Sequence, residues 1–179
     1  MTPQDIHHFW FETLSPEDWF AQNPKLDRRI AASFGPLVLA APSGMLAAWR
    51  TSAVGRLAEI LVLDQFPRNI YRDRAEAYHG DALALQMAKQ AIAADAPREL
   101  PAVERAFVYM PFMHSESLAE HERALELFSE PGLENQLKHE RRHRAILERF
   151  GRYPQRNAAL GRESTAEEAA FLAEPGSGF

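Results

Sequence analysis

The chain contains no cysteine among its 179 residues. This absence excludes disulfide bonds, thiol nucleophiles and zinc sites with cysteine ligands, and it suits a reducing compartment. Long apolar runs are missing too, because the longest, at residues 36–42 and 60–63, are far too short to span a bilayer. The N-terminus also lacks the basic segment and apolar run of a signal peptide. We therefore expect a cytoplasmic protein with no membrane partner.

A strong charge of one sign is missing as well. The formal net charge is only -5, which favours neither nucleic acid nor a membrane surface. A basic run could follow a nucleic-acid backbone, but the overall acidity and the glutamates of residues 116–130 favour a solvated helix face. The basic residues are Lys138, Arg141, Arg142, Arg144, Arg149, Arg152, Arg156 and Arg162. Nucleic acid is therefore not a predicted partner.

No segment shows the sustained alternation of apolar and polar residues that is typical of a strand, so we predict no sheet. Apolar residues instead recur at helical spacing after helix-start signals. The expected helices begin near Pro3, Pro16, Pro24, Thr51, Asp81, Pro101, Ser115 or Ser117, Leu133 and Ser164-Thr165. Their short connections favour antiparallel neighbours. We predict one all-α domain of antiparallel helical hairpins over residues 1–179, with a frayed tail at 175–179.

Aromatic residues are dense at the start of the chain. Phe9, Trp10, Phe11, Trp19 and Phe20 all lie within the first expected helices. Large aromatic side chains dominate core packing, so we expect these residues to anchor the first helices in the core.

One short phrase occurs twice. Residues 65–69 read Gln-Phe-Pro-Arg-Asn and residues 152–157 read Arg-Tyr-Pro-Gln-Arg-Asn. Proline cannot continue a helix without losing a hydrogen bond, so each phrase is predicted to end a helix and hold an Arg and an Asn at a rigid corner. Gly35-Pro36 is likewise expected to kink or split a helix, another helix is expected to stop near Pro111, and Gly151 is expected to cap one. Two such corners in a small domain predict one shared polar site.

That site is rich in groups that recognise anions. Guanidinium forks suit phosphate or carboxylate, and asparagine amides can orient a ligand. The alternative is that Asp64, Gln65 and Glu116 pair with the arginines and lock helix ends together. The two interpretations are compatible if one arginine is left free. The candidate ligand-binding residues are Asp64, Gln65, Arg68, Asn69, Arg72, His114, Glu116, His143, Arg152, Arg156 and Asn157.

Two histidine motifs have a chemical interpretation and a structural one. His114-Ser115-Glu116 could supply a general acid or base, or could simply form a helix cap through Ser115. Residues 139–143 read His-Glu-Arg-Arg-His, which matches the zinc-protease pattern and places both imidazoles on one helix face. The two intervening arginines oppose a dication, however, and no third histidine follows. We predict no metal and no cofactor, although His143 could still face the site near Arg152.

Several longer phrases resemble a bacterial family known as DUF924, and the likeness runs nearly end to end. They are Phe9-Trp10-Phe11, residues 63–72, His114-Ser115-Glu116, residues 150–157 and residues 160–165. The resemblance implies an all-helical fold of the tetratricopeptide-like kind, a right-handed stack, and no activity, since the family is named for having no assigned function. The chain departs from the expected pattern at His121-Glu122, where an Asp-Gln-like pair is expected, and at Gln155, where histidine is expected.

Three functional hypotheses follow. The first is a protein that binds a small anionic ligand, bearing phosphate or carboxylate, in one pocket lined by Arg and Asn. The second is a hydrolase or transferase on a phosphorylated or nucleotide substrate, with His114 or His143 as the acid–base group. The third is a helical-repeat scaffold that binds a peptide partner in an exposed apolar groove.

Overall fold

The computed structural model describes residues 1–176, which exclude most of the tail predicted to be frayed. Within this range there are eight α-helices, several short 3₁₀ and π turns, and no strand, so the all-α prediction is confirmed. The α-helices are α1 (Pro3–His7), α2 (Pro24–Ala40), α3 (Ala53–Ile70), α4 (Asp81–Ala93), α5 (Ala102–Met113), α6 (Leu118–Phe128), α7 (Glu134–Phe150) and α8 (Ala166–Leu172). None of the described helices is long and apolar enough to cross a membrane.

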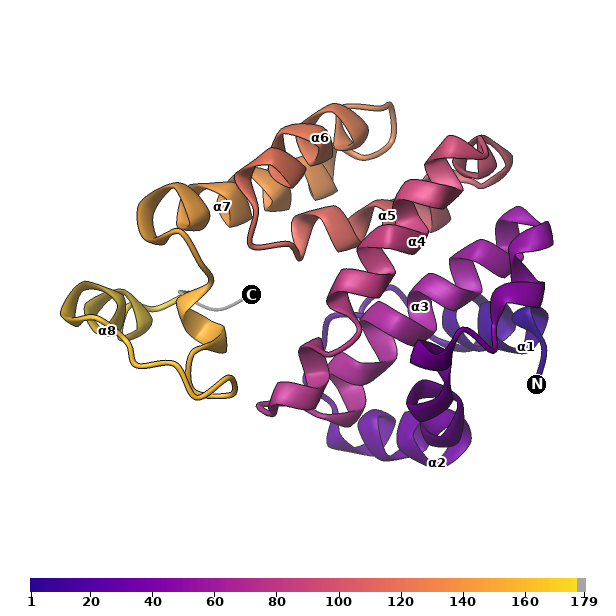
Figure 1. Cartoon of the computed structure of the whole chain (residues 1–179), viewed down its shortest axis with the longest axis horizontal. Helices are drawn as coiled ribbons and strands as arrows, with labels where there is room; N and C mark the ends of the chain where they lie inside the picture. The colour runs from indigo at the N-terminus through magenta and orange to yellow at the C-terminus, as the bar shows by residue number, and fades with distance from the viewer. Residues whose placement is uncertain (177–179) are drawn as a thin grey trace.

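Helix α3 is the centre of the arrangement, since it contacts α1, α2, α4 and α5. Successive helices then pack from α4 to α5, α6 and α7, and the last segment turns back toward the start of α4 (Figure 1). The hydrogen bond between Arg156 and Asp81 joins this returning segment to α4. The tetratricopeptide-like hand of the stack stays a prediction, as does the single-domain organisation.

The core forms around the aromatic residues. The ring of Phe66 on α3 lies 4.8 Å from Phe34, 5.6 Å from Trp10 and 6.2 Å from Phe9, measured between centroids. Phe9, Trp10, Phe34 and Phe66 are all buried, which fits the expected anchoring role of the N-terminal aromatic residues. Phe20 is the exception, since 66% of it is exposed.

Most helix starts agree with the capping signals. Thr2 and Thr165 each form a capping box with the acidic residue three positions later, and Asn23 caps α2. The cap of α3 is Ser52, whose hydroxyl accepts from the backbone N–H of Gly55, and not Thr51. The helix predicted at Ser15-Pro16 is wrong. There the Asp18 carboxylate accepts from the Ser15 N–H and hydroxyl, which closes a turn.

Prolines do not end the helices as predicted. Pro36 and Pro67 lie inside helices, so α2 is not split and α3 continues beyond Pro67 to Ile70. The reason is that α3 is buried on nearly every face, and this packing outweighs one lost backbone hydrogen bond. Pro111 also lies inside α5, but that helix ends at Met113, near the predicted stop. The second phrase is different, because α7 has already ended at Gly151, whose φ of 69° is a left-handed cap.

Candidate functional site

The two repeated phrases meet at Asp81, the first residue of α4. Arg68 donates from its two terminal nitrogens to the two carboxylate oxygens of Asp81, at 2.9 and 3.0 Å. Arg156, from the turn after α7, donates to the same carboxylate at 3.1 Å. Because α3 continues past Pro67, Arg68 lies within the helix and reaches Asp81. The helical residues after the proline therefore help to build the site.

Tyrosine rings hold the two guanidinium groups. The Cζ atom of Arg156 lies 4.7 Å from the ring centroid of Tyr78 and 4.7 Å from that of Tyr153. The Cζ atom of Arg68 lies 5.8 Å from the ring of Tyr78. A planar guanidinium beside aromatic faces is fixed in orientation at little entropic cost. The donor forks are therefore preorganised.

A buried carboxylate and a histidine complete the cluster. Asp64 is fully buried, and one of its oxygens lies 2.7 Å from Nδ1 of His114 and 3.1 Å from Arg68. Gln65 donates to the other oxygen at 2.5 Å. Burial alone would raise the pKa of Asp64, but Arg68 and His114 together hold that pKa well below its usual range. Asp64 is thus an anion at neutral pH.

The protonation of His114 follows from these neighbours. Burial lowers its pKa, the charge of Arg68 lowers it further, and the opposing effect of Asp64 does not reverse the shift. The imidazole is therefore neutral at pH 7, and its proton lies on Nδ1, where ionised Asp64 accepts it. Nε2 of His114 has no hydrogen-bond partner among the described residues, and 16% of the side chain is exposed.

Other candidate residues lie in separate networks. Asn69 and Arg72 both donate to Asp27 of α2, at 3.0 and 2.6 Å, and so join α3 to α2. Glu116 accepts a bidentate pair from Arg162, at 2.7 and 2.9 Å. These three candidates therefore act as ties between segments.

Arg152 and Asn157 belong to a network around Glu168 on α8. Glu168 accepts from Arg152 at 2.7 Å and 2.8 Å, from Asn157 at 3.3 Å and from the Thr165 N–H at 2.8 Å. The bonds from Arg152 and Thr165 lower the pKa of Glu168 to about 2. This network holds α8 against the end of α7 and is distinct from the cluster at Asp81.

The zinc-protease pattern has a structural role. His143 donates from Nδ1 to the His139 carbonyl at 2.9 Å, and burial lowers its pKa to about 3. Glu140 instead lies in the core, 2.6 Å from Nδ1 of His121, and both side chains are fully buried. Over residues 1–176, no three His, Asp or Glu side chains come together as a metal site would require. The buried side-chain amide of Gln155 has no partner among the same residues.

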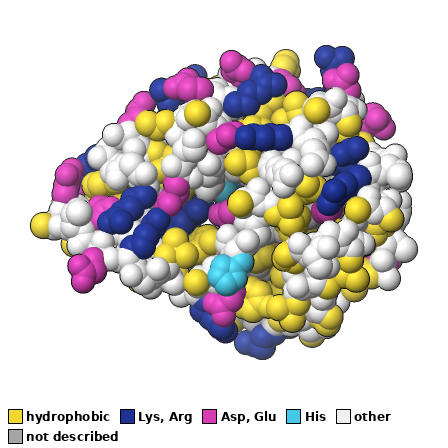
Figure 2. Space-filling model, viewed as in Figure 1, with side chains coloured by type: hydrophobic (Ala, Val, Ile, Leu, Met, Phe, Trp, Pro, Cys, Tyr) yellow, Lys and Arg dark blue, Asp and Glu magenta, His cyan; other side chains and the backbone are white. Residues whose placement is uncertain are grey.

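The charges of the cluster cancel. Arg68 and Arg156 face Asp64 and Asp81, and the other two candidate arginines are also paired with carboxylates. This pairing favours the interpretation that the arginines lock segments together. Asp64 pairs with Arg68 as that interpretation expects, whereas Asp81, Asp27 and Glu168 are partners that the sequence did not indicate. On the face shown in Figure 2, basic and acidic side chains are likewise interspersed.

Hydrogen-bonding capacity nevertheless remains in the cluster. Arg156 uses one N–H of each terminal nitrogen, for Asp81 and for the His114 carbonyl. Its other N–H groups, and the Nε–H of Arg68, have no acceptor among the described residues. The side chains are 20% (Arg68), 17% (Asp81), 16% (His114) and 11% (Arg156) exposed, so solvent still reaches them.

Sequence reasoning missed two members of the cluster. The sequence marks Asp81 only as a helix start and gives no signal for Tyr78. An acidic residue in a first helical turn is common, and no local pattern indicates which distant arginine it will meet. The two phrases contain arginines but no carboxylates. That imbalance was the one signal that a carboxylate elsewhere in the chain, such as Asp81, would pair with them.

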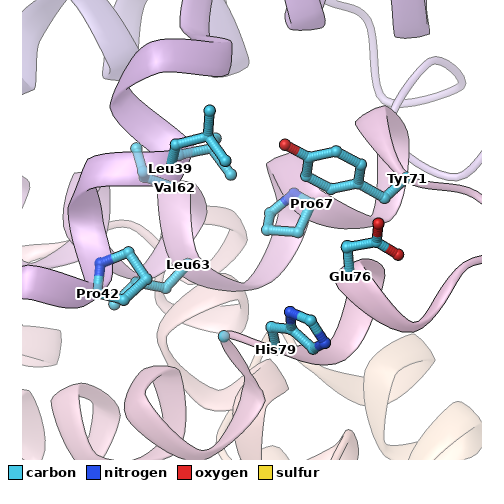
Figure 3. A pocket seen from close by; sticks show the side chains of 10 residues that line it. Leu39, Pro42, Val62, Leu63, Pro67, Tyr71, Glu76 and His79 are labelled. Atoms are coloured by element: carbon cyan, nitrogen blue, oxygen red, sulfur yellow. The ribbon is translucent and has the colours of Figure 1, made fainter. Parts of the chain in front are cut away.

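A separate cavity of about 170 Å³ lies beside Pro67 (Figure 3). Its wall is apolar, and Tyr71, Glu76 and His79 stand at one side. Leu39, on the opposite side, is 73% exposed. The remaining lining residues are Val38, Pro42, Val62, Leu63, Pro67 and Gly80.

Comparison with known proteins gives a family and no activity. The chain is similar to the structure of a protein of unknown function, ATU0120 from Agrobacterium tumefaciens, with 38% sequence identity and a TM-score of 0.90 over 96% of each chain. Among curated proteins there is no match. Residues 6–176 match the family described as "Bacterial protein of unknown function (DUF924)", and the chain therefore belongs to that family.

Proposed function

We propose that the protein binds a small acidic ligand, bearing phosphate or carboxylate, at the cluster of Arg68, Asp81, His114 and Arg156. The observation that carries the proposal is the convergence of Arg68 and Arg156 on one partly exposed carboxylate, with N–H groups left over. A merely structural pair would need only one arginine for Asp81. Ring contacts from Tyr78 to both guanidiniums support the same view, because they hold the spare donors in place.

Internal pairing changes how the ligand would be held. Since the charges of the cluster already cancel, an anion gains little from long-range attraction. Recognition depends instead on directed N–H donors, which are stronger when the donor is charged and already oriented. The cost is that the ligand must share Arg68 and Arg156 with Asp81.

The test is a titration calorimetry panel on the purified protein with inorganic phosphate, phosphate monoesters, nucleotides and small carboxylates. Arg156→Lys keeps the charge and removes the planar fork, so the affinity should fall about tenfold or more. The matched control is Arg152→Lys, which alters an arginine paired with Glu168 outside the cluster and should leave the affinity unchanged. No binding by wild type, or equal losses in both variants, would overturn the proposal.

A second candidate is an enzyme, a hydrolase or transferase on a phosphorylated or nucleotide substrate. The pairing of His114 with buried Asp64 favours it, because a carboxylate that orients a neutral imidazole makes the outer nitrogen a usable base. Turnover of phosphate esters that is lost in His114→Asn would support this candidate. No turnover across the ligands that bind would count against it.

A further inference from the structure

We propose that the site selects an anion that also carries a hydroxyl group, such as hydrogen phosphate or a 2-hydroxy carboxylate, and that His114 Nε2 accepts a hydrogen bond from that hydroxyl. This inference rests on the proposed binding function and specifies its ligand. Both hydrogen-bond donors and an acceptor surround His114.

The acceptor is held in place by the network behind it. Asp64 is buried and bonded to Nδ1 of His114 at 2.7 Å, so the ring cannot turn its other nitrogen inward without leaving a buried carboxylate unsatisfied. Nε2 therefore keeps a lone pair that no described residue uses, on a side chain that is 16% exposed. Arg156 donates to the backbone carbonyl of His114 at 2.8 Å, which ties the arginine donors to the same residue.

The surrounding charges favour a ligand that supplies a donor. The charged groups facing His114 are Asp64 and Arg68 from α3, Asp81 from α4 and Arg156 from the turn after α7. Their charges cancel, so net charge does not decide which anion binds. An anion without a proton would place its oxygen against the lone pair of Nε2 with no hydrogen between them. An anion with a hydroxyl group meets both the arginine donors and the histidine acceptor.

Matched ligand pairs test this directly. Hydrogen phosphate and sulfate have the same tetrahedral shape, but only phosphate carries a hydroxyl group at pH 7.5. Lactate and propanoate differ in the 2-hydroxyl in the same way. Wild type should bind the member with the hydroxyl at least about tenfold more tightly in at least one pair, because a site built to accept a hydrogen bond rejects an analogue without the donor.

A variant then identifies the acceptor. In His114→Asn the side-chain amide can still donate to Asp64, while the outer nitrogen is gone, so the preference within each pair should disappear. His114→Gln, which places an oxygen near the position of Nε2, should keep part of it. Thermal unfolding of each variant establishes that it is folded.

The outcomes separate the two proposals. If none of the four probes or the wider panel binds, the proposed binding function is wrong. If both members of each pair bind equally well, the function stands and the selection of a protonated ligand is overturned. A preference that persists in folded His114→Asn would assign the acceptor elsewhere and overturn the role of His114. If His114→Asn does not fold, the affinities of wild type for the two members of each pair still show whether the site selects a protonated ligand.

Discussion

The two ends of the chain are held together by different kinds of contact. Helices α1 to α5 bury aromatic and aliphatic side chains against one another around α3. In contrast, the buried residues of α7 are Glu140, His143 and Leu147, and α8 buries only Glu168 among its described residues. The first region is stabilised mainly by removal of apolar surface from water, and the second depends on paired polar groups.

The difference has consequences for robustness. Helix α3 packs against four other helices, whereas α8 packs on the turn after α7. A buried carboxylate there that loses its partner keeps the full cost of desolvation. Breaking one contact in the C-terminal region should therefore open that region alone. The same loss in the aromatic core should destabilise the whole protein.

The largest effect is expected at the centre of the core. Phe66→Ala removes a fully buried ring that contacts Phe9, Trp10 and Phe34, and should lower the free energy of unfolding by about 3–5 kcal/mol. Urea denaturation measures this loss. The control Phe20→Ala removes an exposed ring and should change stability by less than about 1 kcal/mol. Similar losses in the two variants would mean that the core does not lie around Phe66.

A single polar substitution should open the C-terminal region. Glu168→Gln replaces a buried carboxylate that accepts two bonds from Arg152, and charged hydrogen bonds of this kind are worth about 1.5–3 kcal/mol. Amide exchange in α8 should accelerate by at least about tenfold, while exchange in α3 stays unchanged. Glu167→Gln is the control, because that side chain is 62% exposed and pairs with exposed Arg149. Equal acceleration in α3 would show that the two regions open together.

The same difference explains what the sequence could predict. The aromatic core, the helical class and the cap at Thr165 all follow from local spacing or local chemistry, and they agree with the structure. The pairing of Arg68 and Arg156 with Asp81 does not follow, because it depends on where three distant segments meet. The continuation of α3 through Pro67 does not follow from the sequence for a related reason, since the packing that retains this proline inside the helix comes from other helices.

On acidification, the C-terminal region should lose stability at a higher pH than that at which the carboxylates become protonated. The folded pKa of His143 is about 3 against 6.5 for an exposed histidine, so below pH 6.5 the unfolded chain takes up a proton that the folded chain does not. Stability from this group falls as pH drops, by about 1.4 kcal/mol for each pH unit, or about 2 kcal/mol between pH 6.5 and 5.

The measurement compares unfolding free energies at the two pH values. His143→Asn retains a donor for the His139 carbonyl and cannot titrate, so its loss on acidification should be about 2 kcal/mol smaller than that of wild type. His8→Asn, at a site where the side chain is 67% exposed, should behave as wild type. If acidification weakens His143→Asn as much as wild type, buried His143 is not the group responsible.

The smallest effects are expected when the same substitution, threonine to alanine, is made at a helix cap in each region. Thr2 and Thr165 have the same capping box, in which the hydroxyl accepts from the third residue's N–H at 3.3 and 3.1 Å. Replacing either by alanine should cost about 1 kcal/mol. In Thr2→Ala the loss should appear in global urea unfolding, because α1 carries fully buried Ile6 into the core. In Thr165→Ala it should appear only as about fivefold faster amide exchange in α8, since that helix can open without exposing an apolar core. A global loss in Thr165→Ala equal to that of Thr2→Ala would mean that the polar network joins the two ends of the chain into one cooperative unit.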